Sequence, residues 1–114
     1  MKINEDNLAP IIIDLNIKSK GEITESFLTI LGHGIKTILR RMFWEDYGIP
    51  SGVKVRGTTS QLTAFQSAIT HEKKYLDAIS EYGLNDPKTY RNRAMLDTSV
   101  RKFERKTGLK WPFE

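Results

Sequence analysis

Apolar and polar residues alternate in a short stretch near the N-terminus, which is the pattern of a β-strand. The alternating apolar positions are Ile11, Ile13, Leu15 and Ile17. A lone strand has to pair with another strand, which is either the later stretch GVKVRG or a strand of a neighbouring subunit. The chain offers few other strand candidates, so we expect no adequate partner for this strand within the chain. We therefore expect an extended arm, residues 1–20, that docks on another subunit through these four side chains.

The next stretch has the period of an α-helix and a wide apolar face. Thr24 can cap its N-terminus, and we predict a helix over residues 24–46. Gly32 and Gly34 lie in its middle, where glycines indicate a bend or the close approach of another backbone. The following stretch, 47–57, is predicted as a loop with room for one short strand. The repeating apolar positions of the helix are Phe27, Leu31, Ile35, Ile38 and Met42.

Residues 58–107 carry the start and stop signals of two consecutive helices. The connection between the two helices is short, so they have to be antiparallel neighbours and form a helical hairpin. The signals are the capping box of Thr58 and Gln61, Gly83 as the end of the first helix, Asp86 and Pro87 as the start of the second, and Gly108 as its end.

The predicted fold is mostly α, with an extended N-terminal arm, one hydrophobic helix, an antiparallel helical hairpin and a short C-terminal aromatic tail. We assign residues 21–114 to a single helical domain, in which residues 108–114 are the tail. Glu72 is the one polar residue at a predicted core position of the hairpin. The other core positions are Leu62, Phe65, Ile69, Leu76 and Ile79 in its first helix and Leu96, Val100 and Phe103 in its second.

Charge is distributed unevenly along the 114 residues, which carry a net charge of +4. Residues 1–35 hold three lysines against five acidic residues, whereas residues 86–110 hold eight basic residues against three acidic ones. The absence of cysteine excludes disulfides and thiolate metal ligands. The polar N-terminus does not resemble a signal peptide, and no apolar stretch is long enough to cross a bilayer. We expect a cytoplasmic product.

Candidate catalytic chemistry is sparse. His33 and His71 are the only histidines, and no acidic residue stands at metal-ligand spacing from both, so we interpret both as structural. The sequence has no phosphate-binding loop, no GxSxG or HExxH motif and no calcium-binding loop. We therefore predict that the protein is not an enzyme and binds no cofactor and no metal.

The second hairpin helix is predicted to carry a basic stripe on the side away from its core positions. Five cations fall within a wedge of about 100° when each residue advances the helix by about 100°. The stripe could be a solvated face, a contact for an acidic protein surface or a contact for nucleic acid. Docking of helix 24–46 on a membrane surface is a further, less favoured possibility. The stripe residues are Lys88, Arg91, Lys102, Arg105 and Lys106.

The C-terminal tail ends on two large aromatic residues separated by a proline. In an extended segment Trp111 and Phe113 face the same side, and Pro112 restricts the backbone between them. We expect this pair to insert into a groove on another subunit. The alternative is that the tail folds back on helix 24–46, near Phe43 and Trp44, and completes the protein's own core.

The hairpin GTTSQLTAFQSAITHEKKYLDAISEYGLNDP, followed by KFERKTGLKWPF, resembles small uncharacterised structural and assembly proteins of tailed bacteriophages. The resemblance covers residues 56–114 and implies a component of a virion or of its assembly. Taken together, these features favour a non-enzymatic structural or assembly subunit that docks on other protein subunits, either copies of itself or a larger assembly, through its arm, first helix and tail. The alternative is a nucleic-acid-binding accessory protein that uses its last helix.

Overall fold

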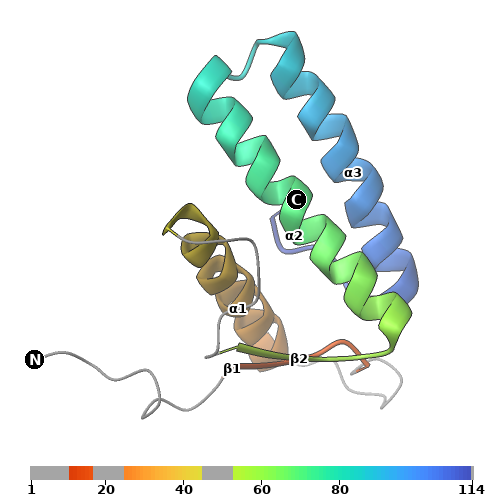
Figure 1. Ribbon diagram of the computed structural model, residues 1–114. Helices are drawn as coiled ribbons and strands as arrows, with labels where there is room; N and C mark the ends of the chain where they lie inside the picture. The colour runs from red at the N-terminus through yellow and green to blue at the C-terminus, as the bar shows by residue number, and fades with distance from the viewer. Residues whose placement is uncertain (1–10, 17–24, 45–52, 114) are drawn as a thin grey trace, which may run out of the picture.

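The computed structural model describes residues 11–16, 25–44 and 53–113, and the fold is mostly helical, as predicted (Figure 1). The predicted hydrophobic helix and both hairpin helices are present. A pair of short strands is also present, one before the hydrophobic helix and one after it. The elements in chain order are β1 (Ile11–Asp14), α1 (Glu25–Trp44), β2 (Val53–Arg56), α2 (Thr59–Tyr82) and α3 (Pro87–Thr107).

The strands β1 and β2 pair with each other in parallel, and α1 lies between them in the sequence. Ile11 pairs with Val53 and Ile13 with Val55, and the Leu15 N–H donates to the Arg56 carbonyl over 2.7 Å just beyond the ladder. Parallel strands need a long crossover connection, which a helix usually supplies. The stretch GVKVRG is therefore the partner of β1 within the chain.

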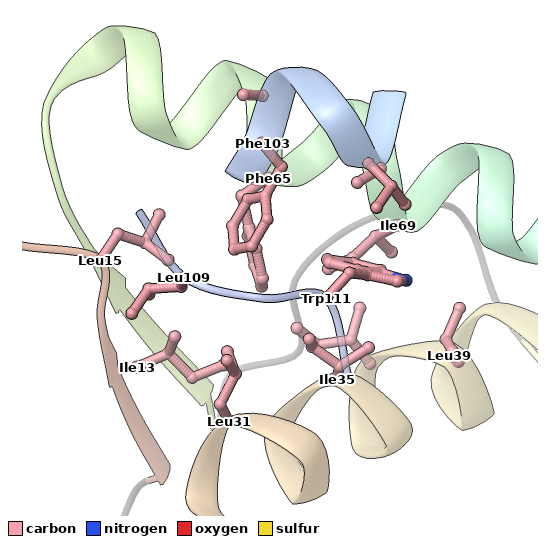
Figure 2. Close-up of a cluster of buried hydrophobic side chains, with 14 of the residues drawn as sticks. Ile13, Leu15, Leu31, Ile35, Leu39, Phe65, Ile69, Phe103, Leu109 and Trp111 are labelled. Carbon is pink, nitrogen blue, oxygen red and sulfur yellow. The ribbon is translucent and has the colours of Figure 1, made fainter. Parts of the chain in front are cut away.

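The strand pairing corrects the expectation that the arm docks on another subunit. Ile13 and Leu15 are fully buried in the protein's own core, and Ile11 is half-buried against it (Figure 2). The physical reason is that β2 satisfies the backbone of β1 while α1 covers its apolar side. Ile17 and the rest of the predicted arm, residues 1–10 and 18–20, lie outside the described residues.

The glycine Gly34 allows α1 to lie directly on β1. A Cβ atom at this position would lie 2.6 Å from Ile13 Cδ1, closer than normal packing permits, and 3.3 Å from Ile11 Cγ2, a tight contact. At Gly32, by contrast, a Cβ atom would meet only Pro112 Cβ at 3.9 Å, an ordinary contact. Of the two glycines in α1, only Gly34 is thus needed for the close approach of the β1 side chains to the helix.

We expect Gly34→Ala to lower stability and Gly32→Ala to raise it. Both substitutions gain about 1 kcal/mol of helix propensity. Only the first forces a methyl group against Ile13, and overpacking of this kind costs about 1–3 kcal/mol. Urea unfolding of the two variants measures the difference. Equal stabilisation by both would show that α1 and β1 are not in close contact.

The caps of α2 and α3 confirm the signals in the sequence. The Gln61 backbone N–H donates to Thr58 Oγ1 over 3.1 Å, and the Thr58 backbone N–H donates to Gln61 Oε1 over 2.9 Å, which makes the reciprocal capping box. Asp86 caps α3, with Pro87 as its first residue. Gly83 and Gly108 follow the two helices with φ of 82° and 73°, a backbone region that favours glycine.

The hairpin and α1 enclose one hydrophobic core (Figure 2). Phe65 and Ile69 of α2 and the predicted core residues of α3, Leu96, Val100 and Phe103, are all buried there. Leu62 and Ile79 are half-buried. The prediction that Leu76 is a core residue is wrong, because its side chain is exposed on the outer side of α2. Glu72, the polar residue at a predicted core position, is buried.

Candidate functional site

The C-terminal tail packs into the core of its own chain. Trp111 is only 2% exposed, and its ring centroid lies 5.2 Å from that of Phe103 and 6.3 Å from that of Phe65, both edge-to-face. Figure 2 shows the Trp111 ring between the hairpin and Ile35 of α1. Phe113 is half-buried, and its ring centroid lies 6.2 Å from that of Trp111.

This packing corrects the expectation that Trp111 inserts into another subunit. Gly108 turns the chain at the end of α3, and the buried Leu109 then directs it back across the hairpin. For Trp111 the alternative is correct: the tail folds back and completes the core of its own chain. Its aromatic neighbours are Phe65 and Phe103 of the hairpin, and the side chains of Phe43 and Trp44 lie outside the described ones.

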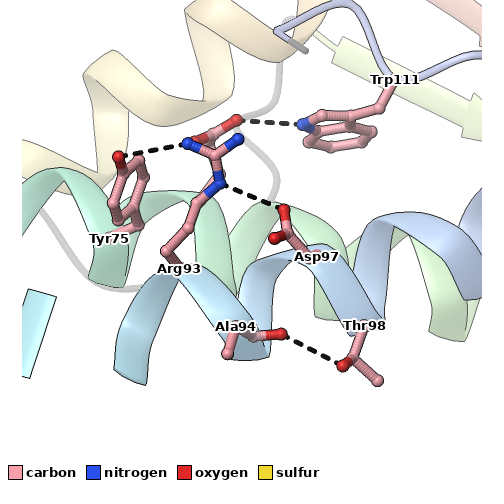
Figure 3. A network of polar contacts seen from close by, with 7 residues as sticks. Tyr75, Arg93, Ala94, Asp97, Thr98 and Trp111 are labelled. Carbon is pink, nitrogen blue, oxygen red and sulfur yellow. Dashed lines mark hydrogen bonds and ion pairs between the residues drawn. The ribbon is translucent and has the colours of Figure 1, made fainter. Parts of the chain in front are cut away.

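Two carboxylates hold the tail in position. The Trp111 indole nitrogen donates to Glu72 Oε1 over 3.0 Å, a bond drawn in Figure 3, and the Trp111 backbone N–H donates to Glu104 Oε2 over 2.9 Å. Hydrogen bonds to charged acceptors are stronger than neutral ones. The polar residue that interrupts the apolar pattern of α2 is thus the acceptor that a buried tryptophan requires. The sequence pattern showed Glu72 as an exception, and only the folded tail explains it.

The basic stripe lies on the solvent side of α3, where the helical pattern placed it. All five of its cations are exposed: Lys88, Arg91, Lys102, Arg105 and Lys106. Lys88 Nζ lies 4.5 Å above the ring of Tyr82, at the α2 end of the hairpin loop. Within the part of the chain that the structure describes, none of the five forms an ion pair.

An open pocket of about 400 Å³ lies between the C-terminal half of α3 and the tail. Arg93 donates to Asp97 over 3.1 Å and to the Tyr75 hydroxyl over 3.4 Å, and these bonds hold the pKa of Arg93 above its usual range (Figure 3). Glu104 is engaged with Trp111, as described above. Arg101 and Lys110 are the exposed cations that remain. The lining residues are Arg93, Asp97, Val100, Arg101, Glu104, Lys110 and Trp111.

Arg101 and Lys110 extend the positive surface beyond the predicted stripe. Arg101 stands one helical turn before Arg105, so its side chain adjoins the stripe on the side of the pocket. Lys110 reaches the same pocket from the tail. The helical pattern alone assigned neither residue to the stripe. Both residues are among the eight basic residues of stretch 86–110, so the excess of positive charge in that stretch was the sequence feature that pointed to them.

The half-buried His71 links the two hairpin helices. Its Nδ1 is hydrogen-bonded to Ser99 Oγ, which in turn lies 3.3 Å from Ser67 Oγ. Burial lowers the pKa of His71, and the nearby Lys74 lowers it further. Ser99 is buried, and neither residue lines the pocket. The arrangement is suited to joining α2 to α3, while His33 is exposed on α1.

The described side chains include no group of three or more His, Asp or Glu residues placed to share a metal ion. Among the described residues, no helix combines the length and the apolar character needed to cross a membrane. Comparison of the chain with protein-family models, with curated proteins and with solved structures found no match.

Proposed function

We propose that this protein is a non-enzymatic structural or assembly subunit that associates with copies of itself through the free end of its helical hairpin. The observation that carries the proposal is the exposure of three large side chains at the α2–α3 turn, Tyr82, Leu84 and Tyr90, which we call the hairpin tip. These side chains are 39%, 61% and 58% exposed. Leu84 lies in the α2–α3 loop, Tyr82 ends α2 and Tyr90 lies in the first turn of α3, and this loop is at the end of the hairpin away from β1 and β2 (Figure 1).

Hydrogen bonds within the chain hold the backbone and Tyr90 of the hairpin tip, which favours its use in binding. The buried Thr89 hydroxyl donates to the Gly83 carbonyl over 2.6 Å, and the Thr89 backbone N–H donates to the Asp86 carbonyl over 3.0 Å. The Tyr90 hydroxyl donates to Asn85 Oδ1 over 3.3 Å. A surface held in its binding conformation loses little conformational entropy when it docks. Tyrosine is also enriched in protein interfaces.

The charges around the hairpin tip favour a second copy of the chain as its partner. Glu81, Asp86 and Lys88 stand next to the hairpin tip in the sequence, and Lys88 lies over Tyr82, so both signs of charge are close to the tip. In a two-fold symmetric contact the same patch meets itself, and opposite charges can be brought together across the axis. The resemblance to proteins of tailed bacteriophages favours a virion as the larger assembly in which such copies would be incorporated.

We expect Leu84→Asp combined with Tyr90→Asp to abolish self-association. The wild-type protein should show a molar mass above that of the 13.1 kDa chain in size-exclusion chromatography with light scattering, and this mass should rise with concentration. The double variant should be a folded monomer, because both side chains are exposed. Charge placed in an apolar contact is desolvated without a partner.

Met95→Asp is the matched control, since Met95 is an exposed apolar residue on α3 outside the hairpin tip. It adds one carboxylate to an exposed apolar position, where the tip variant adds two, and should leave the mass of the oligomer unchanged. A wild-type protein that stays monomeric at its highest soluble concentration would refute self-association. A tip variant with the wild-type mass would refute the hairpin tip as the contact.

A further inference from the structure

We propose that the solvent face of α3 binds the phosphate backbone of nucleic acid without reading its sequence. The binding surface, which we call the cationic face, joins the basic stripe to the two cations at the pocket. This proposal does not depend on self-association through the hairpin tip, which the cationic face meets at Lys88. The residues of the cationic face are Lys88, Arg91, Arg101, Lys102, Arg105, Lys106 and Lys110.

The described part of the chain supplies no ion-pair partner for the charge of the cationic face. Among the described residues, none of its seven cations takes part in an ion pair. The two carboxylates on α3 are already engaged, Asp97 with Arg93 and Glu104 with the backbone N–H of Trp111. At the start of α3, Asp86 accepts from the Lys88 backbone N–H as the helix cap. Positive charge therefore dominates this side of the hairpin.

The dimensions of the cationic face match a run of phosphates. From Lys88 to Lys106 the helix rises by about 27 Å at about 1.5 Å per residue. One strand of B-DNA carries about eight phosphates over that length, at about 3.4 Å each. Arg101 adjoins Arg105 one turn earlier, and with Lys110 it widens the positive surface at the C-terminal end of α3. Several phosphates can thus be contacted at once.

The composition of the face favours phosphates over an acidic protein and over base recognition. No stripe position is itself aromatic, and the ring of Tyr82 at one end of α3 is covered by Lys88. Four of the seven cations are lysines, a residue in which protein interfaces are depleted. Base recognition in single strands depends on aromatic stacking platforms, which the stripe lacks. Met95 is an exposed apolar residue on the same helix. Contacts of this kind position a nucleic acid but do not select its sequence.

The test is fluorescence anisotropy of the full chain with a labelled duplex of mixed sequence between about 50 and 200 mM salt. We expect affinity to fall steeply with salt and to change little when the sequence is altered. Reversing three charges, Arg91→Glu, Lys102→Glu and Arg105→Glu, should weaken binding by about 100-fold at the lowest salt. The slope of log affinity against log salt should become shallower by about 3, one unit for each lost phosphate contact.

The matched control reverses three exposed cations on other elements, Lys36→Glu, Lys54→Glu and Lys74→Glu. It changes the net charge by the same amount and should retain most of the affinity and slope. Equal losses in both triple variants would reduce the effect to net charge and overturn the assignment to α3. Absence of salt-sensitive binding in the wild-type protein would overturn it as well.

A second pair of variants tests the pocket side of the face. Arg101→Glu with Lys110→Glu should weaken binding further and reduce the slope by about 2. Unchanged binding would exclude the pocket side from the contact surface. If the three stripe reversals instead abolish self-association and leave nucleic-acid binding unaffected, the partner of the stripe is protein and the proposal is wrong. Circular dichroism of each variant confirms that these exposed substitutions leave the fold intact.

Discussion

Trp111→Ala is expected to lower the free energy of unfolding by about 3–5 kcal/mol, the usual cost of removing a large buried aromatic side chain. The ring contributes to an aromatic cluster with Phe65 and Phe103, and its loss would leave a cavity between the hairpin and α1. For a chain of this size the change corresponds to a fall in Tm of the order of 10–20 °C. Thermal and urea unfolding of the monomeric protein measure it.

The variant Trp111→Phe distinguishes the contribution of the buried ring from that of the indole hydrogen bond. The phenyl ring keeps much of the apolar contact but cannot donate to the buried Glu72. We expect this variant to lose about 1–3 kcal/mol, the cost of removing one partner of a buried hydrogen bond. A Trp111→Ala protein that keeps its wild-type Tm but no longer assembles would show that the tail docks on another subunit.

Ile13→Ala is expected to cost about 2–5 kcal/mol, because Ile13 is fully buried where β1 meets α1. The neighbouring Ile12 points to the other side of the strand and is 40% exposed. Ile12→Ala should therefore change stability by no more than about 0.5 kcal/mol. Urea unfolding of the two variants compares adjacent isoleucines of one strand, so strand propensity is the same in both.

The comparison also decides the role of the arm. If β1 belongs to the protein's own core, Ile13→Ala lowers stability at all protein concentrations and Ile12→Ala does not. If the strand were instead held by a neighbouring subunit, the loss would appear as a lower oligomer mass with little change in the unfolding of the monomer. That second result would contradict the pairing of β1 with β2.

Much of the hairpin could be predicted because its signals are local. The Thr58 capping box, the Asp86 cap with Pro87, and the glycine at each helix end act within a few residues of the chain, so their geometry depends little on the rest of the fold. The exposure of the basic stripe follows from the same local pattern. Once Leu96 and its apolar neighbours face the core, the cations on the opposite side of α3 have to face solvent.

The strand pairing was only partly predictable. Both strands were recognised as candidates from their apolar residues. Their partnership depends on the whole connection between them, since a parallel pair forms only when a helix such as α1 crosses over and covers one face. The alternation of Ile11, Ile13 and Leu15 specifies an apolar face equally well for a partner within the chain and for one outside it.

The three helices, the caps of α2 and α3 and the exposed line of cations follow from local signals, because helix periodicity and capping are set by neighbours along the chain. The positions of β1 and Trp111 depend instead on contacts between residues far apart in the sequence. A buried aromatic side chain is favoured by any apolar surface that can exclude water from it, and that preference carries no information about which molecule supplies the surface. Here the hairpin, α1 and the carboxylate of Glu72 supply it from within the same chain.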